Sequence, residues 1–229
     1  MLKKVVLISG GAAVGKTAVL KNIIPLLQSK DLALSVCKID CVATRDGLVY
    51  QNMNIPHVVG ISGDICPDHF LVSNLPELYN WADEKQSDVL LIETAGLCHR
   101  CSPATEQMVA GCVLDCTSSC HAPAQLGPML TYADFVVLTK IDMVSQAERE
   151  IILWKIKELN PTAKLFTVDG LTGYGAEGLA DWLSCFSKET NFDDDVLRHS
   201  MPSGVCSYCV GEKRVGSAYQ QGVVGKIEF

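Results

Sequence analysis

The sequence lacks three features that mark common classes of protein. Its 19 lysine and arginine residues are outnumbered by 26 acidic residues, which gives a net charge of −7, and they form no basic cluster. No apolar run approaches the roughly 20 residues that a membrane-spanning helix requires. Residues 1–4 lead into a short apolar strand and not into a signal peptide. We therefore expect a cytoplasmic protein whose partners are neither nucleic acids nor membranes.

Hydrophobic residues and cysteines are plentiful instead. The chain has 229 residues, 48% of them hydrophobic, which is enough for a sizeable core in one domain with an appendage. It also has 11 cysteines. Because the cytosol keeps thiols reduced, a disulfide framework is a poor explanation for so many cysteines. Metal or redox chemistry is the better one.

A phosphate-binding loop follows the first apolar run of the chain. Gly10, four further residues and then Gly15-Lys16-Thr17 have the spacing of this loop, between a predicted strand and a predicted helix. Glycines let successive backbone N–H groups face a phosphate, and the helix adds its positive end. Lys16 would neutralise the β- and γ-phosphates, and Thr17 would bind Mg²⁺. The predicted nucleotide-binding residues here are Gly10, Gly11, Ala12, Ala13, Val14, Gly15, Lys16, Thr17 and Ala18.

Two acidic residues end predicted strands that should lie beside this loop. Asp40 follows the apolar run that begins at Leu32, and Glu93 follows a second apolar run. A carboxylate at such a position can hold a water of Mg²⁺ or orient the attacking water. Three residues after Glu93, the amide of Gly96 can contact the γ-phosphate, so its loop would move when that phosphate leaves. We predict that Lys16, Asp40 and Glu93 are catalytic and that Thr17, Asp40 and Glu93 hold Mg²⁺.

A third strand end predicts which base is bound. The run from Asp134 to Leu138 is followed by Thr139, Lys140 and Asp142. A carboxylate at the position of Asp142 can accept hydrogen bonds from the ring N–H and the exocyclic amine of guanine. Adenine lacks both donors in that arrangement, so GTP is favoured over ATP.

Cysteines next to the nucleotide-sensing segments are candidate ligands of a transition metal. Cys66 and His69 stand at the predicted entrance of a helix, where the pKa of a thiol is lowered. Cys98 and Cys101 form a C-x-x-C directly after Gly96, so a metal there would respond to the state of the triphosphate. A redox dithiol or two unrelated thiols remain alternatives.

The other cysteines are weaker candidates. Cys112 lies inside a predicted strand and is expected in the core, whereas Cys116 and Cys120 follow that strand and are possible neighbours of the C-x-x-C. Cys206 and Cys209 stand among turn residues near the end of the chain, in the pattern of a metal knuckle.

The order of these segments predicts the fold. Apolar strands alternate with helical patterns, which indicates an α/β fold of three layers, the P-loop NTPase fold, with a mostly parallel sheet flanked by helices. Ligands should bind at the carboxyl ends of the strands. Residues 1–187 would form the GTPase domain, and residues 188–229 would form a linker and a small cysteine-bearing tail.

Together these motifs resemble the HypB/UreG/CobW family of metallochaperone GTPases. The resemblance rests on Gly10–Thr17, Asp40, Glu93–Gly96, Thr139–Asp142 and the loop at residues 171–175, over about 185 residues in order. It implies slow GTP hydrolysis that controls the binding of nickel, zinc or a similar metal and its delivery to a target metalloenzyme or its accessory proteins. It also implies a homodimer whose assembly depends on nucleotide or metal.

Two positions depart from the family pattern. Thr139 stands where most members have asparagine, and Cys66-Pro67-Asp68-His69 looks like the Cys-Pro-His metal motif of urease-type members with Asp68 inserted.

Two other functions fit parts of the sequence. An ATP-dependent iron–sulfur redox or maturation protein of the nitrogenase-iron-protein class would hold a cluster on the same cysteines. That class carries a second lysine after the first glycine of the phosphate loop, where this chain has Gly11. A scaffold that binds nucleotide without hydrolysing it would not need Lys16, Asp40 and Glu93.

Overall fold

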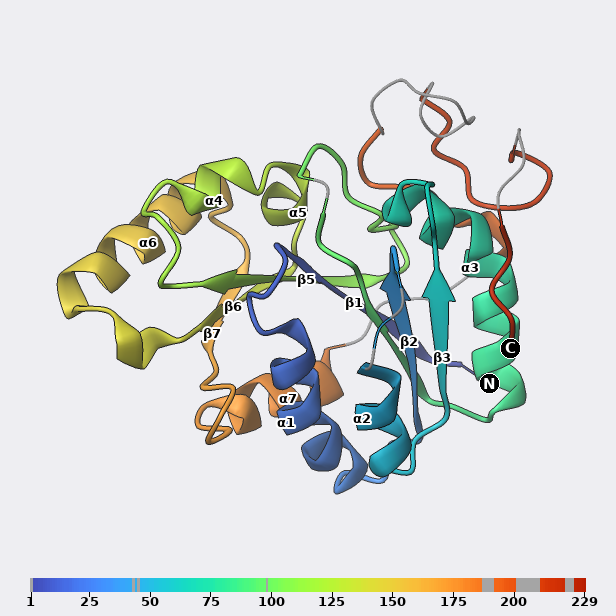
Figure 1. Ribbon diagram of the computed structural model, residues 1–229, viewed down its shortest axis with the longest axis horizontal. Helices are drawn as coiled ribbons and strands as arrows, with labels where there is room; N and C mark the ends of the chain where they lie inside the picture. The colour runs from blue at the N-terminus through green and yellow to red at the C-terminus, as the bar shows by residue number, and fades with distance from the viewer. Residues whose placement is uncertain are drawn as a thin grey trace.

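The computed structural model describes residues 2–42, 44, 46–97, 99–186, 192–200, 211–220 and 225–229. Within these ranges seven strands form one sheet in the order β3-β2-β4-β1-β5-β6-β7, and each neighbouring pair is parallel (Figure 1). The strands are β1 (Lys4–Gly10), β2 (Leu34–Asp40), β3 (His57–Ile61), β4 (Val89–Glu93), β5 (Val109–Asp115), β6 (Phe135–Thr139) and β7 (Lys164–Thr167).

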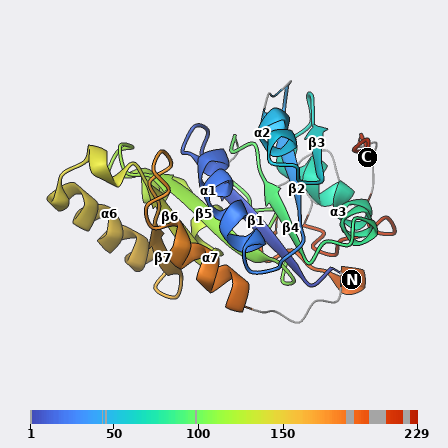
Figure 2. The same ribbon diagram turned by 90° about the horizontal axis from the view of Figure 1, so that it is seen from below.

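Helices cover both faces of this sheet. Along β1, Val6 and Ile8 pack with α1, α2 and α7, whereas Val5 and Leu7 pack with α3 on the opposite face. Figure 2 shows α1 lying across the middle of the sheet, with α3 towards one end and α6 towards the other. The described α-helices are α1 (Lys16–Gln28), α2 (Asp46–Asn52), α3 (Pro67–Glu84), α4 (Ala122–Gln125), α5 (Pro128–Thr131), α6 (Gln146–Leu159) and α7 (Ala176–Cys185). The predicted three-layer α/β fold is confirmed.

Local sequence signals explain several boundaries. Pro67 is the first residue of α3, where its missing N–H costs nothing. The side chain of Ser145 accepts a hydrogen bond from the Glu148 N–H, and the Glu148 carboxylate accepts one from the Ser145 N–H, so this capping box starts α6. The helix α2 is a difference, since residues 40–47 are predicted as a polar connection and the helix begins at Asp46.

The described residues beyond 187 pack against the domain. Leu197, Val215 and Ile227 are buried in the same core cluster as α3. Arg198 donates from Nε to the Thr105 carbonyl oxygen at 2.8 Å and forms a 2.8 Å ion pair with Asp134. The division at residue 187 stays a prediction, but these described residues share a core with the domain.

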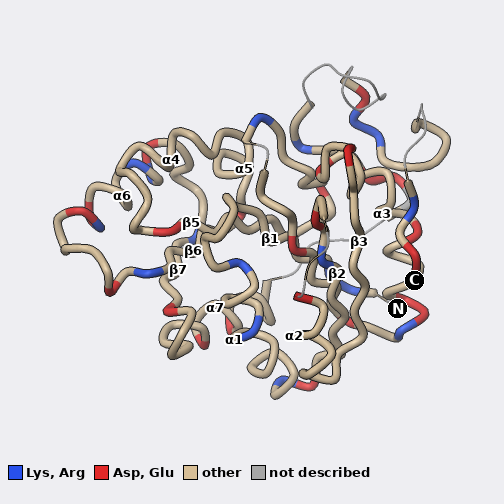
Figure 3. Tube along the Cα trace, viewed as in Figure 1, with Lys and Arg blue, Asp and Glu red and all other residues tan. Residues whose placement is uncertain are grey.

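Charged residues are spread along the described chain. Lys and Arg are scattered over several elements, with Asp and Glu between them (Figure 3). In the described part of the chain, no helix combines the length and the apolar character that crossing a bilayer demands.

Candidate functional site

The loop between β1 and α1 has the conformation that its glycines allow. Gly10 has φ +136°, and a Cβ there would lie 2.3 Å from the Val113 carbonyl oxygen, so no larger residue fits. The ammonium group of Lys16 donates to the carbonyl oxygens of Gly10, at 3.1 Å, and Gly11, at 2.7 Å. Burial lowers the pKa of Lys16 to about 8. The lysine is therefore folded back into its own loop.

A buried network of acids and bases lies beside the start of α1. The hydroxyl of Thr17 donates to Oε1 of Glu93 at 2.7 Å, and Lys38 Nζ lies 2.6 Å from the same oxygen. Lys38 also lies 3.1 Å from Oδ2 of Asp46, and the Tyr50 hydroxyl donates to Oε2 of Glu93 at 2.7 Å. Because Glu93 is only 1% exposed, these partners compensate a charge that would otherwise be costly to bury.

The network changes the acidity of its members. Burial lowers the pKa of Lys38, but the carboxylates of Glu93 and Asp46 outweigh burial, and the net shift is upward. Burial and the Glu93 charge both raise the pKa of Tyr50. Lys38 therefore stays a cation and Tyr50 stays a neutral donor at ordinary pH.

Asp40 and four residues of this network, Thr17, Lys38, Asp46 and Glu93, line one cavity. Its volume is about 480 Å³. Asp40 is the last residue of β2, and its Oδ1 accepts a hydrogen bond from the Cys41 N–H at 2.8 Å. Besides Asp40, the cavity is lined by Ala12, Ala13, Gly15, Lys16, Thr17, Ala18, Lys38, Asp46, Glu93, Ala95 and Leu97. The three residues predicted as catalytic thus share one cavity with the phosphate loop.

The loop after β4 lies directly on the phosphate loop. Gly96 has φ +78°, and a Cβ built on it would lie 2.2 Å from the Gly10 carbonyl oxygen and 2.6 Å from Lys16 Nζ. Only glycine permits both the backbone conformation and this approach. Gly96 is therefore packed against both Lys16 and the backbone of the phosphate loop.

The predicted base-binding segment also contacts the phosphate loop. Thr139 donates from Oγ1 to the Val14 carbonyl oxygen at 2.7 Å, so its short side chain bridges the two loops. Lys140 has a left-handed backbone conformation and forms an ion pair with Asp115. Asp142 follows in a short 3-10 helix, η1 (Ile141–Met143), with its side chain exposed.

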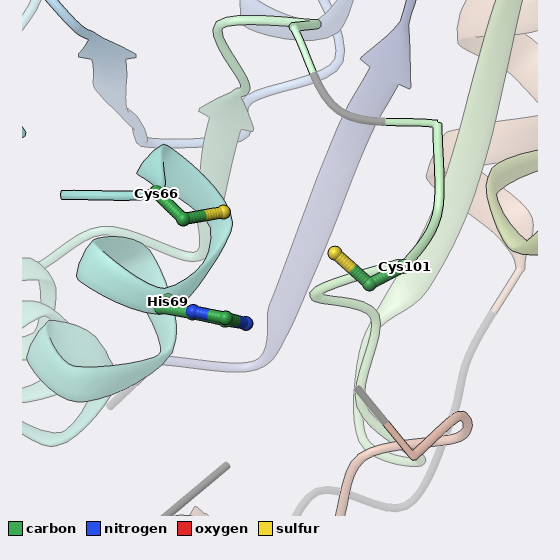
Figure 4. A group of neighbouring side chains, drawn as sticks. All are labelled: Cys66, His69 and Cys101. Atoms are coloured by element: carbon green, nitrogen blue, oxygen red, sulfur yellow. The ribbon is translucent and has the colours of Figure 1, made fainter. Parts of the chain in front are cut away.

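Two thiols and an imidazole meet between α3 and the loop after β4. One potential ligand atom from each of Cys66, His69 and Cys101 lies within 4.8 Å of those of the other two. Figure 4 shows Cys66, at the N-cap of α3, and His69, in the first turn of α3, facing Cys101. Cys101 is 1% exposed and His69 is 9% exposed. The hydrogen bond from Cys101 lowers the pKa of Cys66 to about 5, against the effect of burial, and backbone N–H groups of His69 and Asp68 lower it further. Thiolate and imidazole ligands suit zinc and similar transition metals.

A family model described as the nucleotide-binding domain of CobW/HypB/UreG matches residues 4–167, which is more than half of the chain. The chain belongs to the CobW/HypB/UreG family. The uncharacterized protein MJ0120 of Methanocaldococcus jannaschii is 43% identical over 225 residues, covering 98% of this chain and 96% of that relative. The urease accessory protein UreG of Yersinia pestis is 26% identical over 212 residues, covering 86% of this chain and 92% of UreG.

The solved structures agree on the fold. HypB from Helicobacter pylori in complex with nickel superposes with a TM-score of 0.63 at 18% identity, over 82% of this chain and 92% of HypB. The family resemblance seen in the sequence is confirmed by the family model.

In this CobW/HypB/UreG protein, only some of the candidate cysteines are brought together. Within the described ranges, Cys66, His69 and Cys101 are the one group of three or more potential metal ligands. Cys112 is fully buried, as predicted for a core residue, and Cys116 is buried in the cluster under α6. Cys120 is exposed. Cys98, Cys206 and Cys209 lie outside the described residues.

Several residues of this family member escaped the sequence reasoning. Lys38, Asp46 and Tyr50 complete the network around Glu93, and Asp68 accepts a hydrogen bond from the Cys101 thiol at 3.4 Å. Burial, together with the neighbouring Cys66, raises the pKa of Asp68 to about 7. The sequence does contain a signal for Lys38, because a lysine in the interior of a buried strand is unusual: strands buried on both faces rarely carry charge.

Proposed function

We propose that this protein hydrolyses GTP and uses the change of nucleotide to bind and release a transition-metal ion held by Cys66, His69 and Cys101. The observation that supports this most directly is the path of one loop. It begins against the phosphate loop, where Gly96 approaches Gly10 and Lys16, and five residues later it supplies Cys101 to the thiol group. A displacement at one end of so short a segment reaches the other end.

The nucleotide half of the proposal follows from the charges of the cavity. Lys16 is held by carbonyl oxygens of its own loop and would exchange them for oxygens of the β- and γ-phosphates. That exchange moves the ammonium group away from its contact with Gly96. Asp40, which lines the cavity, would orient the attacking water.

Mg²⁺ fits the oxygen atoms of this cavity. The hydroxyl of Thr17 and the carboxylates of Glu93 and Asp40 would hold it directly or through water, and hard oxygen ligands of this kind suit the ion. When bound, the ion would neutralise charge on the phosphates. The proposal of GTP over ATP rests on Asp142, whose exposed carboxylate follows the segment that bridges to the phosphate loop.

The metal ion is the cargo. Three ligands complete only part of a tetrahedral site, which leaves a fourth position for a second copy of the chain or for the recipient protein. The similarity to the urease accessory protein UreG and to a HypB structure that contains nickel favours nickel as the ion and a metalloenzyme or its accessory proteins as the recipient. Zinc is the other candidate, because thiolate and imidazole ligands suit it. We propose a homodimer that forms with nucleotide or metal.

The experiment is a metal titration of three proteins. Wild type, the variant with Cys66→Ser and Cys101→Ser, and the control Cys120→Ser are titrated with Ni²⁺ and Zn²⁺ while bound to a non-hydrolysable GTP analogue. We expect the double variant to lose affinity by more than about 100-fold, because it lacks two thiolate ligands. Cys120 is exposed and outside the group, so its replacement should change nothing. Unchanged metal stoichiometry in the double variant would refute the assignment.

Phosphate release with GTP and with ATP, measured on the same samples, tests the enzymatic half. We expect slow release that prefers GTP and stops in Lys16→Ala. Visible absorbance from iron in protein purified without oxygen would favour the iron–sulfur alternative.

A further inference from the structure

Lys38 is a buried cation at the centre of the acidic cluster in the nucleotide cavity. Its side chain is 6% exposed, and it lies in β2, whose first six residues are all buried. The ammonium group is 2.6 Å from Oε1 of Glu93 and 3.1 Å from Oδ2 of Asp46. Burying an ammonium group is costly unless carboxylates compensate it, and here two of them do.

Glu93, whose Oε1 contacts Lys38, is also one of the residues proposed above to hold Mg²⁺, together with Thr17 and Asp40. The Thr17 hydroxyl lies 2.7 Å from Oε1 of Glu93 and 3.5 Å from Oδ2 of Asp46, so hydroxyl, carboxylates and ammonium form one compact cluster. A divalent cation that used these oxygens would approach Lys38 Nζ within a few ångströms. Two cations cannot share this space without strong repulsion.

We infer that Lys38 takes the place of a divalent cation when no nucleotide is bound. Its ammonium group pairs with the carboxylates of Glu93 and Asp46 until a nucleotide brings Mg²⁺ with it. Lys38 thus determines that the pocket accepts the magnesium–nucleotide complex and rejects the free ion. This inference rests on the proposed nucleotide function of the cavity.

The charges of the cavity explain why a bound nucleotide would allow Mg²⁺ to displace Lys38 from the carboxylates. Lys16 and Lys38 both line the cavity, facing Asp40, Asp46 and Glu93. Free Mg²⁺ would have to displace Lys38 while offering it no new partner. A bound triphosphate supplies anionic oxygens to which the displaced ammonium group can turn, since Lys38 already lies at the cavity wall.

The test measures Mn²⁺ binding by electron paramagnetic resonance without any nucleotide. Mn²⁺ replaces Mg²⁺ at oxygen ligands and reports binding directly. We compare wild type with Lys38→Gln, which removes the charge, and Lys38→Arg, which keeps it. We expect Lys38→Gln to bind Mn²⁺ about 100-fold more tightly than wild type or more, because a unit charge a few ångströms from the ion is removed. Lys38→Arg should behave as wild type does.

Two further proteins make the result decisive. Adding Glu93→Gln to Lys38→Gln should abolish the gained affinity, which locates the new site in this pocket and not at the thiols. If Lys38→Gln folds poorly because two carboxylates lose their partner, Lys38→Gln with Asp46→Asn restores the charge balance and should still bind Mn²⁺ more tightly than wild type. Equal Mn²⁺ affinity of wild type and the folded uncharged variant would overturn the inference.

Failure of the proposed function gives a different pattern. Binding of a fluorescent GTP analogue to wild type in the presence of Mg²⁺ is measured separately. If that binding is absent, the nucleotide proposal fails whatever the Mn²⁺ titrations show. If it is present and the Mn²⁺ affinities are equal, only the role of Lys38 is refuted.

Discussion

Gly96→Ala perturbs the point where the nucleotide loop and the metal-bearing loop touch. The added Cβ would lie 2.2 Å from the Gly10 carbonyl oxygen, 2.6 Å from Lys16 Nζ and 2.9 Å from the Gly11 carbonyl carbon. Two of these neighbours are backbone atoms, which cannot turn away as the end of a flexible side chain can. The loop after β4 must therefore retreat by about 1 Å or more to reach an ordinary van der Waals separation.

The size of the effect follows from two contributions. An alanine in a left-handed conformation costs about 1–2 kcal/mol, and overpacking against a rigid neighbour costs typically about 1–3 kcal/mol. Their sum is less than the stability of most domains, about 5–15 kcal/mol, so the protein should fold. Because the methyl group takes space beside Lys16 Nζ, affinity for a GTP analogue should fall by about 10-fold or more, equal to about 1.4 kcal/mol.

The assay reads both ends of the loop. Affinity for the GTP analogue is measured by fluorescence, and Ni²⁺ or Zn²⁺ affinity is measured with saturating analogue and with GDP. In Gly96→Ala we expect the two metal affinities to converge, since the loop no longer rests on the phosphate loop. Gly211→Ala is the control, because Gly211 has φ +100° and a Cβ there would meet no described residue within 4 Å. If Gly96→Ala kept the wild-type dependence of metal affinity on nucleotide, coupling through this loop would be disproved.

Three further results are expected. Lys16→Ala should weaken GTP binding by about 100-fold in a fluorescence titration, because two charge-assisted hydrogen bonds of ~1.5 kcal/mol each are lost. An unchanged affinity would exclude a role of Lys16 in phosphate binding. In metal-free protein, Cys66 should still be alkylated rapidly at about pH 6, where an ordinary thiol of pKa about 8.5 is under about 1% thiolate. The alkylation rate of Cys66, measured by mass spectrometry, should decrease only as the pH drops through about 5, and in Cys101→Ala the decrease should occur at higher pH. Arg198→Ala should lower the free energy of unfolding in urea by about 2–4 kcal/mol, because the carbonyl oxygens of Thr105 and Tyr132 lose a charged donor and Asp134 loses its ion pair; a loss below about 0.5 kcal/mol would contradict this packing.

Local signals made the nucleotide loop and most helices predictable. The phosphate-loop spacing and the apolar residues that repeat at helical intervals predict a helix over residues 16–28, and α1 has these bounds. The capping box at Ser145 and Glu148 likewise defined the start of α6. These features depend on neighbours in the sequence, which a single sequence contains in full.

The network around Glu93 depends on long-range contacts. Lys38 and Tyr50 reach Glu93 from β2 and α2, 55 and 43 residues away in the sequence. Whether a lysine in a strand meets a carboxylate depends on strand order, and the chain places β4 next to β2 in the sheet although β3 follows β2 in sequence. That order was not available from spacing alone.

The thiol group combines both kinds of information. Cys66 is the N-cap residue of α3 and His69 lies in its first turn, so their proximity follows from helical geometry. Their contact with Cys101 depends on the fold, because Cys101 belongs to the loop that follows β4 in the chain. The same limit applies to Leu197 and Val215, whose burial beside α3 was hidden by the polar residues around them.

The central claim is that the bound nucleotide changes the affinity with which Cys66, His69 and Cys101 bind a metal ion. The most direct measurement is the Ni²⁺ and Zn²⁺ affinity of the wild-type protein with a non-hydrolysable GTP analogue and, separately, with GDP. We expect the two affinities to differ by about 5-fold or more, the lower end of ordinary coupling between sites. Equal affinities in the two nucleotide states would contradict the claim.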